Sequence, residues 1–248
     1  MTIGRVRLDQ TLWLAELQRD AQELGIVLDE GSSLLMVGHL AEVFAENARA
    51  GLTSIEDPVE AIDKHILDSL SVLKACTLVP GLSMADIGSG AGYPGLPLHI
   101  AVGSGRTVLI EASRRKADFL EATVERLGLT GVEVLWQRAE QVGQDMSWRE
   151  GMDLVVSRAV AELRILVELS LPLLKDGGRF VALKGPDVGD EAERALTALE
   201  AVGGRIERTT RLTLPHARGD RTLIIIEKTQ ATDKRYPRRP GIPEKRPL

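Results

Sequence analysis

Short apolar runs alternate with longer amphipathic stretches from about residue 82 onward. Short apolar runs are typical of buried strands, whereas apolar positions three or four residues apart are typical of helices. The runs predict five strands, at residues 83–87, 106–111, 132–136, 153–157 and 178–184. The stretches between them predict helices at residues 95–102, 114–127, 138–144 and 160–174. This alternation implies right-handed crossovers and a parallel sheet with helices on both faces.

The last part of the sheet departs from this alternation. A helix is expected at residues 189–202, followed by two strands at residues 206–215 and 221–227. The segment between those strands, His216–Asp220, is short enough for a hairpin. By analogy between folds, a parallel sheet that ends in an antiparallel hairpin has the seven-stranded methyltransferase topology rather than that of a plain dinucleotide-binding domain. The predicted fold class is therefore α/β, with a Rossmann-like seven-stranded class I methyltransferase sheet.

The chain before this sheet is expected to be helical, because residues 8 to about 76 space their apolar positions at helical intervals. Asp29 or Ser32-Ser33 is expected to cap the second helix. Asp57-Pro58 breaks the pattern before a third helix that runs from Val59 to Cys76. The expected organisation is an N-terminal helical region at residues 1–80, a sheet domain at 81–230 and a basic proline-rich tail at 231–248.

A glycine-rich turn directly after the first predicted strand is the most informative motif. The segment Met84–Leu96 reads Met-Ala-Asp-Ile-Gly-Ser-Gly-Ala-Gly-Tyr-Pro-Gly-Leu. Gly88, Gly90 and Gly92 let the backbone approach a ligand closely, because glycine carries no Cβ. Glu111 ends the second predicted strand 19 residues after Gly92, where an acid can hold the hydroxyls of a ribose. A turn that only packed a strand on a helix would not explain Glu111.

The form of the turn favours S-adenosylmethionine over a dinucleotide. Its spacing differs from G-x-G-x-x-G, and Pro94 and Pro97 lie early in the next helix. Asp86 precedes the glycines, where its carboxylate would repel a pyrophosphate but attract a cation. S-adenosylmethionine carries a sulfonium and an ammonium group. We therefore expect this cofactor, with Asp86 and Glu111 among the residues that bind it.

The carboxyl ends of the later strands carry further candidates, because ligands bind at that edge of an open α/β sheet. Glu140, preceded by Ala139, is a candidate acceptor for the adenine amino group and equally a surface helix residue. Arg158 and Lys184 follow the fourth and fifth strands and are candidates for contacts to the methyl acceptor or to phosphate. Alternatively, Arg158 pairs with Asp86 or Glu140 and only ties the site together.

Three other residues are of types that often function in binding or catalysis, but we interpret them as structural. His65 is a lone histidine near an apolar face, which is more often structural than catalytic. Phe119 and Trp136 are expected to lie in the core.

The residues after the fourth strand restrict the methyl acceptor. Ser157–Val160 reads Ser-Arg-Ala-Val, not the Asn/Asp-Pro-Pro-aromatic segment that often accompanies methylation of exocyclic amino groups. Methylation of pyrimidine carbon 5 needs a cysteine nucleophile, and Cys76 lies in the helical region with no adjacent proline. A ring nitrogen such as guanine N7 fits better, because it is already nucleophilic and loses no proton. Such a reaction needs orientation and electrostatics more than a general base.

Composition narrows the class of protein. The net charge of −5 gives no overall basic field, yet residues 233–248 hold six basic and two acidic side chains. This asymmetry indicates either a polyanionic partner or a solvated chain end. No apolar run approaches the ~20 residues of a membrane helix, and Cys76 with four scattered histidines forms no zinc cluster. We expect a cytoplasmic protein that uses neither metal nor membrane.

Together these residues resemble the glucose-inhibited division protein B family, also called ribosomal RNA small-subunit methyltransferase G. The resemblance covers nearly the whole chain beyond about residue 30. Many methyltransferases share the glycine motif, whereas His-Ile-Leu-Asp-Ser-Leu, Ser-Arg-Ala and the proline-rich tail are more specific. The segments that carry the resemblance are Lys64–Leu70, Asp86–Gly95, Ser157–Ala159, Ala182–Gly185, Tyr236–Arg238, Pro240–Pro243 and Pro247-Leu248.

The resemblance implies methylation of N7 of one guanine in 16S ribosomal RNA of the small ribosomal subunit, with S-adenosylmethionine as donor. It also implies cofactor binding by Gly88, Tyr93, the Ala139-Glu140 pair and Arg158. The family often has leucine or phenylalanine in place of Tyr93, so here a hydroxyl lies near the cofactor, which is tolerated if the ring stacks and the hydroxyl reaches solvent. Two alternatives stay open: a small-molecule methyltransferase on the same fold, and a non-catalytic ribosome assembly factor that retains the cofactor pocket.

Overall fold

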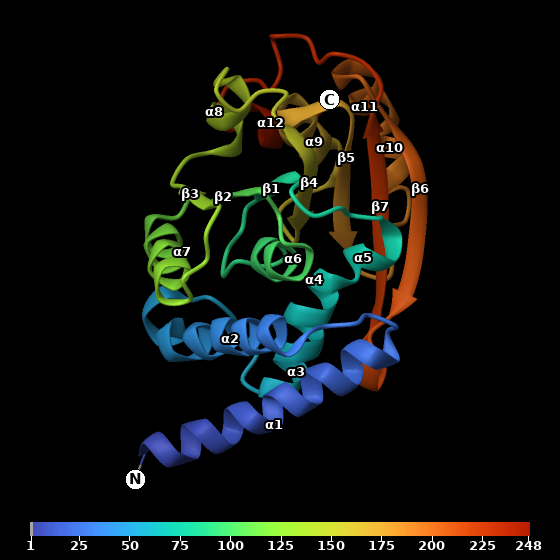
Figure 1. Cartoon of the computed structure of the whole chain (residues 1–248). Helices are drawn as coiled ribbons and strands as arrows, with labels where there is room; N and C mark the ends of the chain where they lie inside the picture. The colour runs from blue at the N-terminus through green and yellow to red at the C-terminus, as the bar shows by residue number, and fades with distance from the viewer. Residues whose placement is uncertain (1) are drawn as a thin grey trace.

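One mixed sheet of seven strands, in the order β3-β2-β1-β4-β5-β7-β6, organises the fold (Figure 1). The computed structural model describes residues 2–248, with side chains described from residue 10 onward except at Ala217. β7 runs antiparallel to β5 and β6, and the other pairs are parallel. This confirms the predicted seven-stranded α/β sheet. The strands are β1 (Ser83–Ile87), β2 (Arg106–Ile110), β3 (Val132–Leu135), β4 (Met152–Arg158), β5 (Leu174–Lys184), β6 (Gly204–Thr213) and β7 (Asp220–Lys228).

The helices follow the predicted alternation closely. Those within the sheet domain are α6 (Gly95–Val102), α7 (Arg114–Arg126), α8 (Ala139–Gln144), α9 (Leu163–Ser170), α10 (Glu191–Arg194) and α11 (Leu196–Val202), with 3-10 turns η2 (Leu171–Leu173) and η3 (Pro215–Ala217). The chain ends with α12 (Ile242–Lys245). The N-terminal elements are α1 (Thr2–Glu23), α2 (Glu30–Ala50), α3 (Pro58–Ala61), the π-helical η1 (Ile62–Leu67), α4 (Asp68–Leu70) and α5 (Val72–Ala75).

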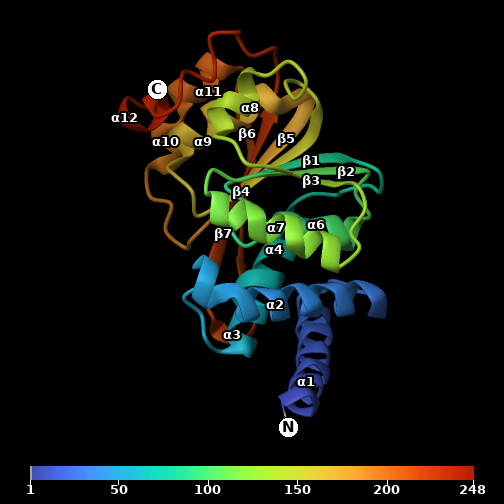
Figure 2. The ribbon, with the colours of Figure 1, turned by 90° about the vertical axis from the view of Figure 1, so that its left-hand side faces the viewer.

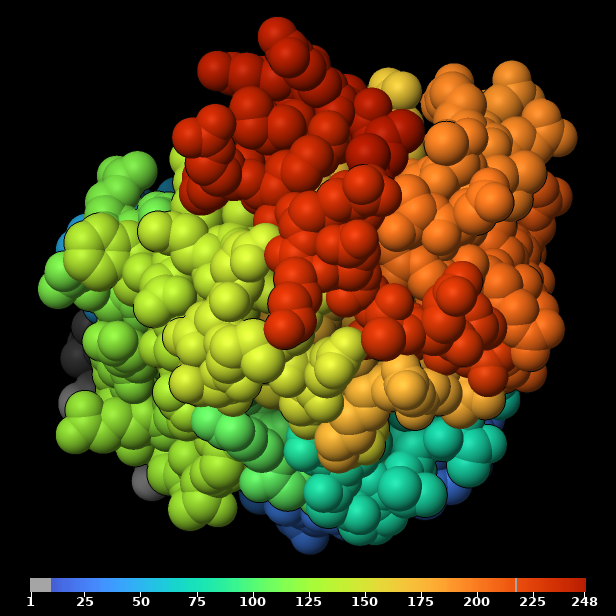
Figure 3. Space-filling model, turned by 90° about the horizontal axis from the view of Figure 1, so that it is seen from above, coloured from blue at the N-terminus to red at the C-terminus, as the bar shows by residue number. Residues whose placement is uncertain are grey.

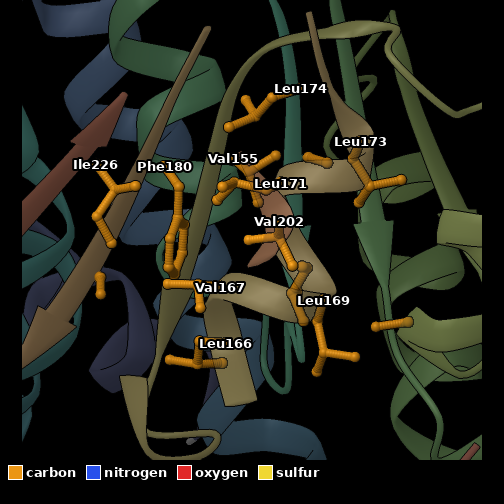
Figure 4. Packing of buried hydrophobic residues seen from close by; sticks show 14 of the residues in the cluster. Val155, Leu166, Val167, Leu169, Leu171, Leu173, Leu174, Phe180, Val202 and Ile226 are labelled. Atoms are coloured by element: carbon orange, nitrogen blue, oxygen red, sulfur yellow. The ribbon is translucent and has the colours of Figure 1, made fainter. Parts of the chain in front are cut away.

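Alternation of side chains along each strand gives the sheet two apolar faces, because successive residues point to opposite sides. In β1, Ala85 and Ile87 join a core cluster with α8, α9 and α11, whereas Met84 joins another cluster with Leu98 of α6. Figure 2 shows the two helix layers on opposite sides of the sheet. In the first cluster, Phe180 of β5 lies close to apolar side chains of α9 (Figure 4). The core thus holds the strand ends rigidly in place.

The fifth strand begins earlier than the sequence predicts. Asp176-Gly177-Gly178 is a turn signal and places the start at residue 178, but β5 begins at Leu174. Its pairing with β4 shifts register between Met152 and Leu154. Gly177 and Gly178 therefore lie in a bulge inside β5, where this strand has more residues than the paired part of β4.

The N-terminal helices share their core with the sheet domain. Leu17 of α1 and Met36 of α2 belong to one buried cluster with Phe119 of α7, which confirms the expected burial of Phe119. Asp29 caps α2, since its Oδ1 accepts the N–H of Ser32 at 2.8 Å. The expected third helix is helical throughout most of its length but contains the π-helical η1. Among the described residues, no helix combines the length and apolar character needed to cross a membrane.

The C-terminal tail is folded onto the sheet domain, so the expectation of a solvated end is wrong. Tyr236 and Pro237 are buried, and Leu248 packs against the cluster that contains α9. Figure 3 shows the tail lying across the top of the molecule between the regions of α8 and α10. The basic residues of the tail thus alternate with apolar residues that are buried against the sheet domain.

His216 in the β6–β7 connection joins that connection to the N-terminal helices. Its Nδ1 lies 3.0 Å from Oδ2 of Asp63, whose side chain is fully buried. The ligand atoms of Glu16, Asp20 and His216 lie within 4.8 Å of one another. Arg19 already donates to both acids of this group, so a cation is in place and we assign no metal there.

Docking of α1 is expected to weaken as the pH rises, because the hydrogen bond that the His216 ring donates to Asp63 raises the pKa of His216. A raised pKa means that the stabilisation is complete below the ordinary value near 6.5 and is lost as the pH rises through the raised value. The charged groups around the ring are Glu16, Asp20, Asp63, Arg19 and Arg218. Thermal unfolding of wild type and His216→Gln should therefore differ by a few degrees near pH 6 and converge toward pH 9. A difference that stays constant over this range would contradict the role of the imidazolium.

Candidate functional site

A cavity of about 410 Å³ opens at the carboxyl ends of β1, β2 and β4, the edge at which open α/β sheets bind ligands. We call it the glycine-turn cavity. Of the predicted cofactor residues, Gly88, Ala139 and Glu140 line it directly. Its other lining residues are Ile87, Ile110, Ala112, Gln137, Arg138, Val160, Ala161, Glu162, Ile165, Leu169, Pro243 and Glu244.

The turn after β1 requires glycine for two physical reasons. Gly88 has a φ of +70°, and a Cβ on it would lie 2.5 Å from Cγ2 of Val160. Gly92 has a φ of +95°, and a Cβ there would meet Leu96 and His39. Gly90 also has a positive φ, of +59°, but a Cβ there would make only ordinary contact, at 3.8 Å from the carbonyl oxygen of Gly88. Of these three glycines, Gly88 contributes bare backbone to the wall of the cavity.

Asp86 lies beneath this turn and shapes it. Its carboxylate is fully buried, and Oδ2 accepts the N–H of Gly95 at 2.9 Å. Its Oδ1 has no hydrogen-bond partner. Burial raises the pKa of Asp86 to about 7, against the lowering effects of the Gly95 N–H and of Arg158. An unpartnered carboxylate oxygen under the turn would be satisfied by a cationic ligand.

Glu111 at the end of β2 holds the glycine turn from the other side. Its Oε2 accepts the N–H of Gly90 at 2.9 Å, and its Oε1 accepts the N–H of Ser113 at 2.7 Å. Each carboxylate oxygen can accept a second hydrogen bond. The arrangement is therefore compatible with the predicted ribose contact, but in this structure the carboxylate orders the turn.

Glu140 is buried at the start of α8, with 8% of its surface exposed, so its interpretation as a surface helix residue is wrong. Its Oε1 accepts the N–H of Gly241 from the C-terminal tail at 2.9 Å. Its Oε2 makes no hydrogen bond to the described residues. Ala139 beside it lines the same cavity.

Tyr93 is stacked as expected, but its hydroxyl does not reach solvent. The ring lies between His39 and His65, with centroid distances of 4.5 and 4.8 Å. Its hydroxyl is buried without a hydrogen-bond partner, and burial raises its pKa. Burial also lowers the pKa of each histidine to about 4, so both rings are neutral at pH 7. His65 thus packs the turn, in line with its structural interpretation.

Arg158 pairs with neither Asp86 nor Glu140. Its Nη1 donates to Oδ2 of Asp68 at 2.9 Å and to the carbonyl of Lys64 at 2.7 Å. These bonds tie the end of β4 to the N-terminal helical region. The ion pair that the sequence suggested for Arg158 is therefore made with a different acid, Asp68.

Lys184 is not free to contact a ligand in this structure. Its Nζ donates to Oε1 of Glu191 at 2.6 Å and to the carbonyl of Ala161 at 2.7 Å. The lysine thus joins the end of β5 to α10. A phosphate contact by Lys184 would require exchange of these bonds.

A second cavity, of about 470 Å³, lies beside the ends of β4 and β5, and we call it the basic cavity. Four of its lining residues are basic and one is acidic. They are Lys64, Arg158, Lys184, Arg221 and Asp68, with His65, Ala159, Leu183 and Gly185. Ala159 lines the basic cavity and Val160 lines the glycine-turn cavity, so the two are neighbours along the chain.

Sequence reasoning missed the acid that organises the basic cavity. Asp68 is 3% exposed and accepts from Arg158 through Oδ2 and from Arg221 through Oδ1, the latter at 2.8 Å. Its place in the specific Lys64–Leu70 segment was a signal, but nothing in the sequence names its partners. The prediction that Trp136 is core is wrong, because this ring is 51% exposed and lies under the Arg114 guanidinium.

Tyr93→Phe is expected to stabilise the protein by about 1 kcal/mol, because it removes a buried hydroxyl that has no partner. Thermal or denaturant unfolding measures the effect. Tyr93→Ala serves as the matched contrast: it also removes the ring between the histidines and should cost about 3 kcal/mol or more. A loss of stability in Tyr93→Phe would show that the hydroxyl has a partner.

Gly88→Ala is expected to weaken cofactor binding by about tenfold or more, because its Cβ meets Val160 and the φ is unfavourable. Calorimetric titration with S-adenosylhomocysteine measures the affinity. Gly177→Ala is the control, since Gly177 has a similar φ of +75° but lies in open space away from the cavity. Equal affinities of the two variants for S-adenosylhomocysteine would show that the glycine turn does not bind the cofactor.

Comparison with known proteins agrees with this geometry. The model of the family described as rRNA small subunit methyltransferase G matches residues 34–219. A relative of that name from Pelotomaculum thermopropionicum is 44% identical over 95% of this chain and 99% of its own. Another, from Symbiobacterium thermophilum, is 41% identical over 97% of this chain and 100% of its own.

Solved structures support the fold. A SAM-dependent O-methyltransferase from Thermotoga maritima matches with a TM-score of 0.51 and 18% identity, over 77% of this chain and 72% of its own. At that identity the likeness concerns the fold alone, a class I methyltransferase sheet. The family model and the relatives go further: this chain belongs to the ribosomal RNA small subunit methyltransferase G family.

Proposed function

We propose that this protein transfers a methyl group from S-adenosylmethionine to N7 of a guanine in 16S ribosomal RNA of the small subunit, in the cytoplasm. The observation that carries the proposal is a contrast of charge between two adjacent cavities. The glycine-turn cavity has three acidic lining residues and one basic one, and the basic cavity has four basic and one acidic. The first suits a cationic cofactor and the second a polyanion. Membership of the family supports the same reading.

The glycine-turn cavity has the groups that the cofactor needs. S-adenosylmethionine would supply an activated methyl group on its sulfonium. The bare backbone at Gly88 lets the ligand approach, and Asp86 offers an unpartnered buried oxygen beneath the turn. We assign the ribose to Glu111 and the adenine amino group to Oε2 of Glu140. Gly90, Gly92 and Tyr93 keep the turn in shape.

The basic cavity would hold the methyl acceptor. Guanine N7 has its own lone pair, so the protein has to orient the base and needs no group to take a proton. His65, which lines this cavity, is unsuited to act as a general base. Its Nε2 lies 2.8 Å from the Thr53 hydroxyl, and burial and Arg158 lower its pKa to about 4. Arg158 and Arg221 would steer the RNA while Asp68 keeps them in place. The guanine would have to be unstacked to enter.

The small-molecule alternative is disfavoured by the relatives of this chain, because the family that it belongs to is described by methylation of ribosomal RNA. Deletion of residues 233–248 does not separate the alternatives. The tail lines the glycine-turn cavity through Pro243 and Glu244, so its removal would disturb that cavity whichever acceptor this protein methylates.

The decisive test supplies the natural substrate. The protein is incubated with tritiated S-adenosylmethionine and small ribosomal subunits from cells that lack their own enzyme, and the labelled nucleoside is identified after digestion. We expect the label in 7-methylguanosine. Label in another nucleoside would contradict the N7 assignment, and no label with intact cofactor binding would favour the assembly factor.

Lys64→Ala should weaken binding to the subunit severalfold and lower the salt slope by about one. Its ammonium lines the basic cavity and is 34% exposed. Lys175→Ala is the matched control, because Lys175 is also exposed but lies beside Asp153 in a different cavity. Equal effects of the two substitutions would mean that the basic cavity does not face the RNA.

A further inference from the structure

The C-terminal segment, residues 232–248, is held to the sheet domain by a dense set of hydrogen bonds. The guanidinium of Arg149 donates to the carbonyls of Thr232, Asp233 and Tyr236 at 2.6, 3.1 and 2.7 Å. The side-chain amide of Gln144 donates to the carbonyl of Pro237 at 2.6 Å. These are contacts to backbone carbonyls, so they fix the path of the segment.

A buried ion pair anchors the next part of the segment. Glu168 of α9 is fully buried, and its two oxygens accept Nε and Nη2 of Arg238 at 2.8 and 2.6 Å. The backbone N–H of Arg238 donates to the same carboxylate at 2.9 Å. Removing the partner of a buried charge is strongly destabilising, so the segment belongs to the folded domain.

Beyond this anchor the segment reaches the glycine-turn cavity. The N–H of Gly241 donates to Oε1 of Glu140 at 2.9 Å, and Pro243 and Glu244 then line the cavity. Pro243 is buried, and α12 packs against α9. The same glutamate therefore contacts the segment through one oxygen and also lines the cavity.

We propose that the C-terminal segment is part of the cofactor-binding site, with Pro243 as an apolar wall beside the adenine end and Glu140 as the joint between segment and ligand. The assignment rests on the proposed function, which places adenine at Glu140. In this proposal the C-terminal segment acts on the cofactor through its backbone and apolar contacts and not through its basic side chains. A segment that completes the pocket must affect cofactor affinity even when RNA is absent.

Calorimetric titration with S-adenosylhomocysteine, without RNA, tests the wall. Pro243→Gly should weaken the affinity by about fivefold, because it removes apolar contact and loosens α12. Lys245→Ala is the matched control, since Lys245 is exposed two residues further on and does not line the cavity. Equal affinities in wild type and Pro243→Gly, with unfolding temperatures unchanged, would overturn the proposal.

Limited proteolysis of the unaltered chain provides a second measurement that no folding defect can confuse. Trypsin can cleave after Lys234, Arg235, Arg238 and Lys245, all within the segment. A ligand that contacts the segment favours its docked state, so saturating S-adenosylhomocysteine should slow cleavage at these bonds severalfold. Unchanged cleavage rates would contradict the proposal.

The two proposals fail in different experiments. A chain whose cofactor affinity depends on Pro243 but which labels no guanine would contradict the proposed function and leave the cofactor-site assignment intact. A chain that labels 7-methylguanosine while Pro243→Gly binds the cofactor as wild type does would contradict the assignment of the segment alone.

Discussion

The basic cavity depends on one buried carboxylate, that of Asp68, which lies between two guanidinium groups. Arg158 comes from the end of β4 and Arg221 from β7, while Asp68 belongs to the N-terminal helical region. A carboxylate that is 3% exposed is tolerated only when it is paired and hydrogen-bonded. The pair of ion pairs therefore joins three distant parts of the chain, and it keeps two arginines at the wall of the basic cavity.

This constraint also explains why the molecule can be acidic overall and still present a basic cavity. The net charge of the chain is −5, and an RNA-binding protein of that charge needs its cations concentrated where the acceptor enters. Asp68 removes only part of the charge of its partners, because it faces two of them. The glycine-turn cavity next to it has the opposite balance of charge, which is the contrast on which the proposed separation of a cationic cofactor from a polyanionic substrate rests.

The C-terminal segment shows how composition can mislead. Six basic side chains in residues 233–248 suggest an arm that binds a polyanion. In the fold, Arg238 neutralises buried Glu168, and Tyr236 and Pro237 are buried. A charge run can therefore serve internal pairing when apolar residues are interspersed with it.

The sequence by itself determined the sheet, its hairpin and the glycine turn, because these follow from local patterns: apolar runs, helical periodicity and residues without a Cβ. It also predicted Asp86, Glu111 and Glu140 as candidate cofactor residues, from their places at or beyond the ends of predicted strands. Only the tertiary structure decided their partners. Asp68 meets Arg158 90 residues away, and Glu140 meets Gly241 101 residues away. Such pairs form only when the fold brings distant segments together, and a local sequence pattern holds no information about contacts over that separation.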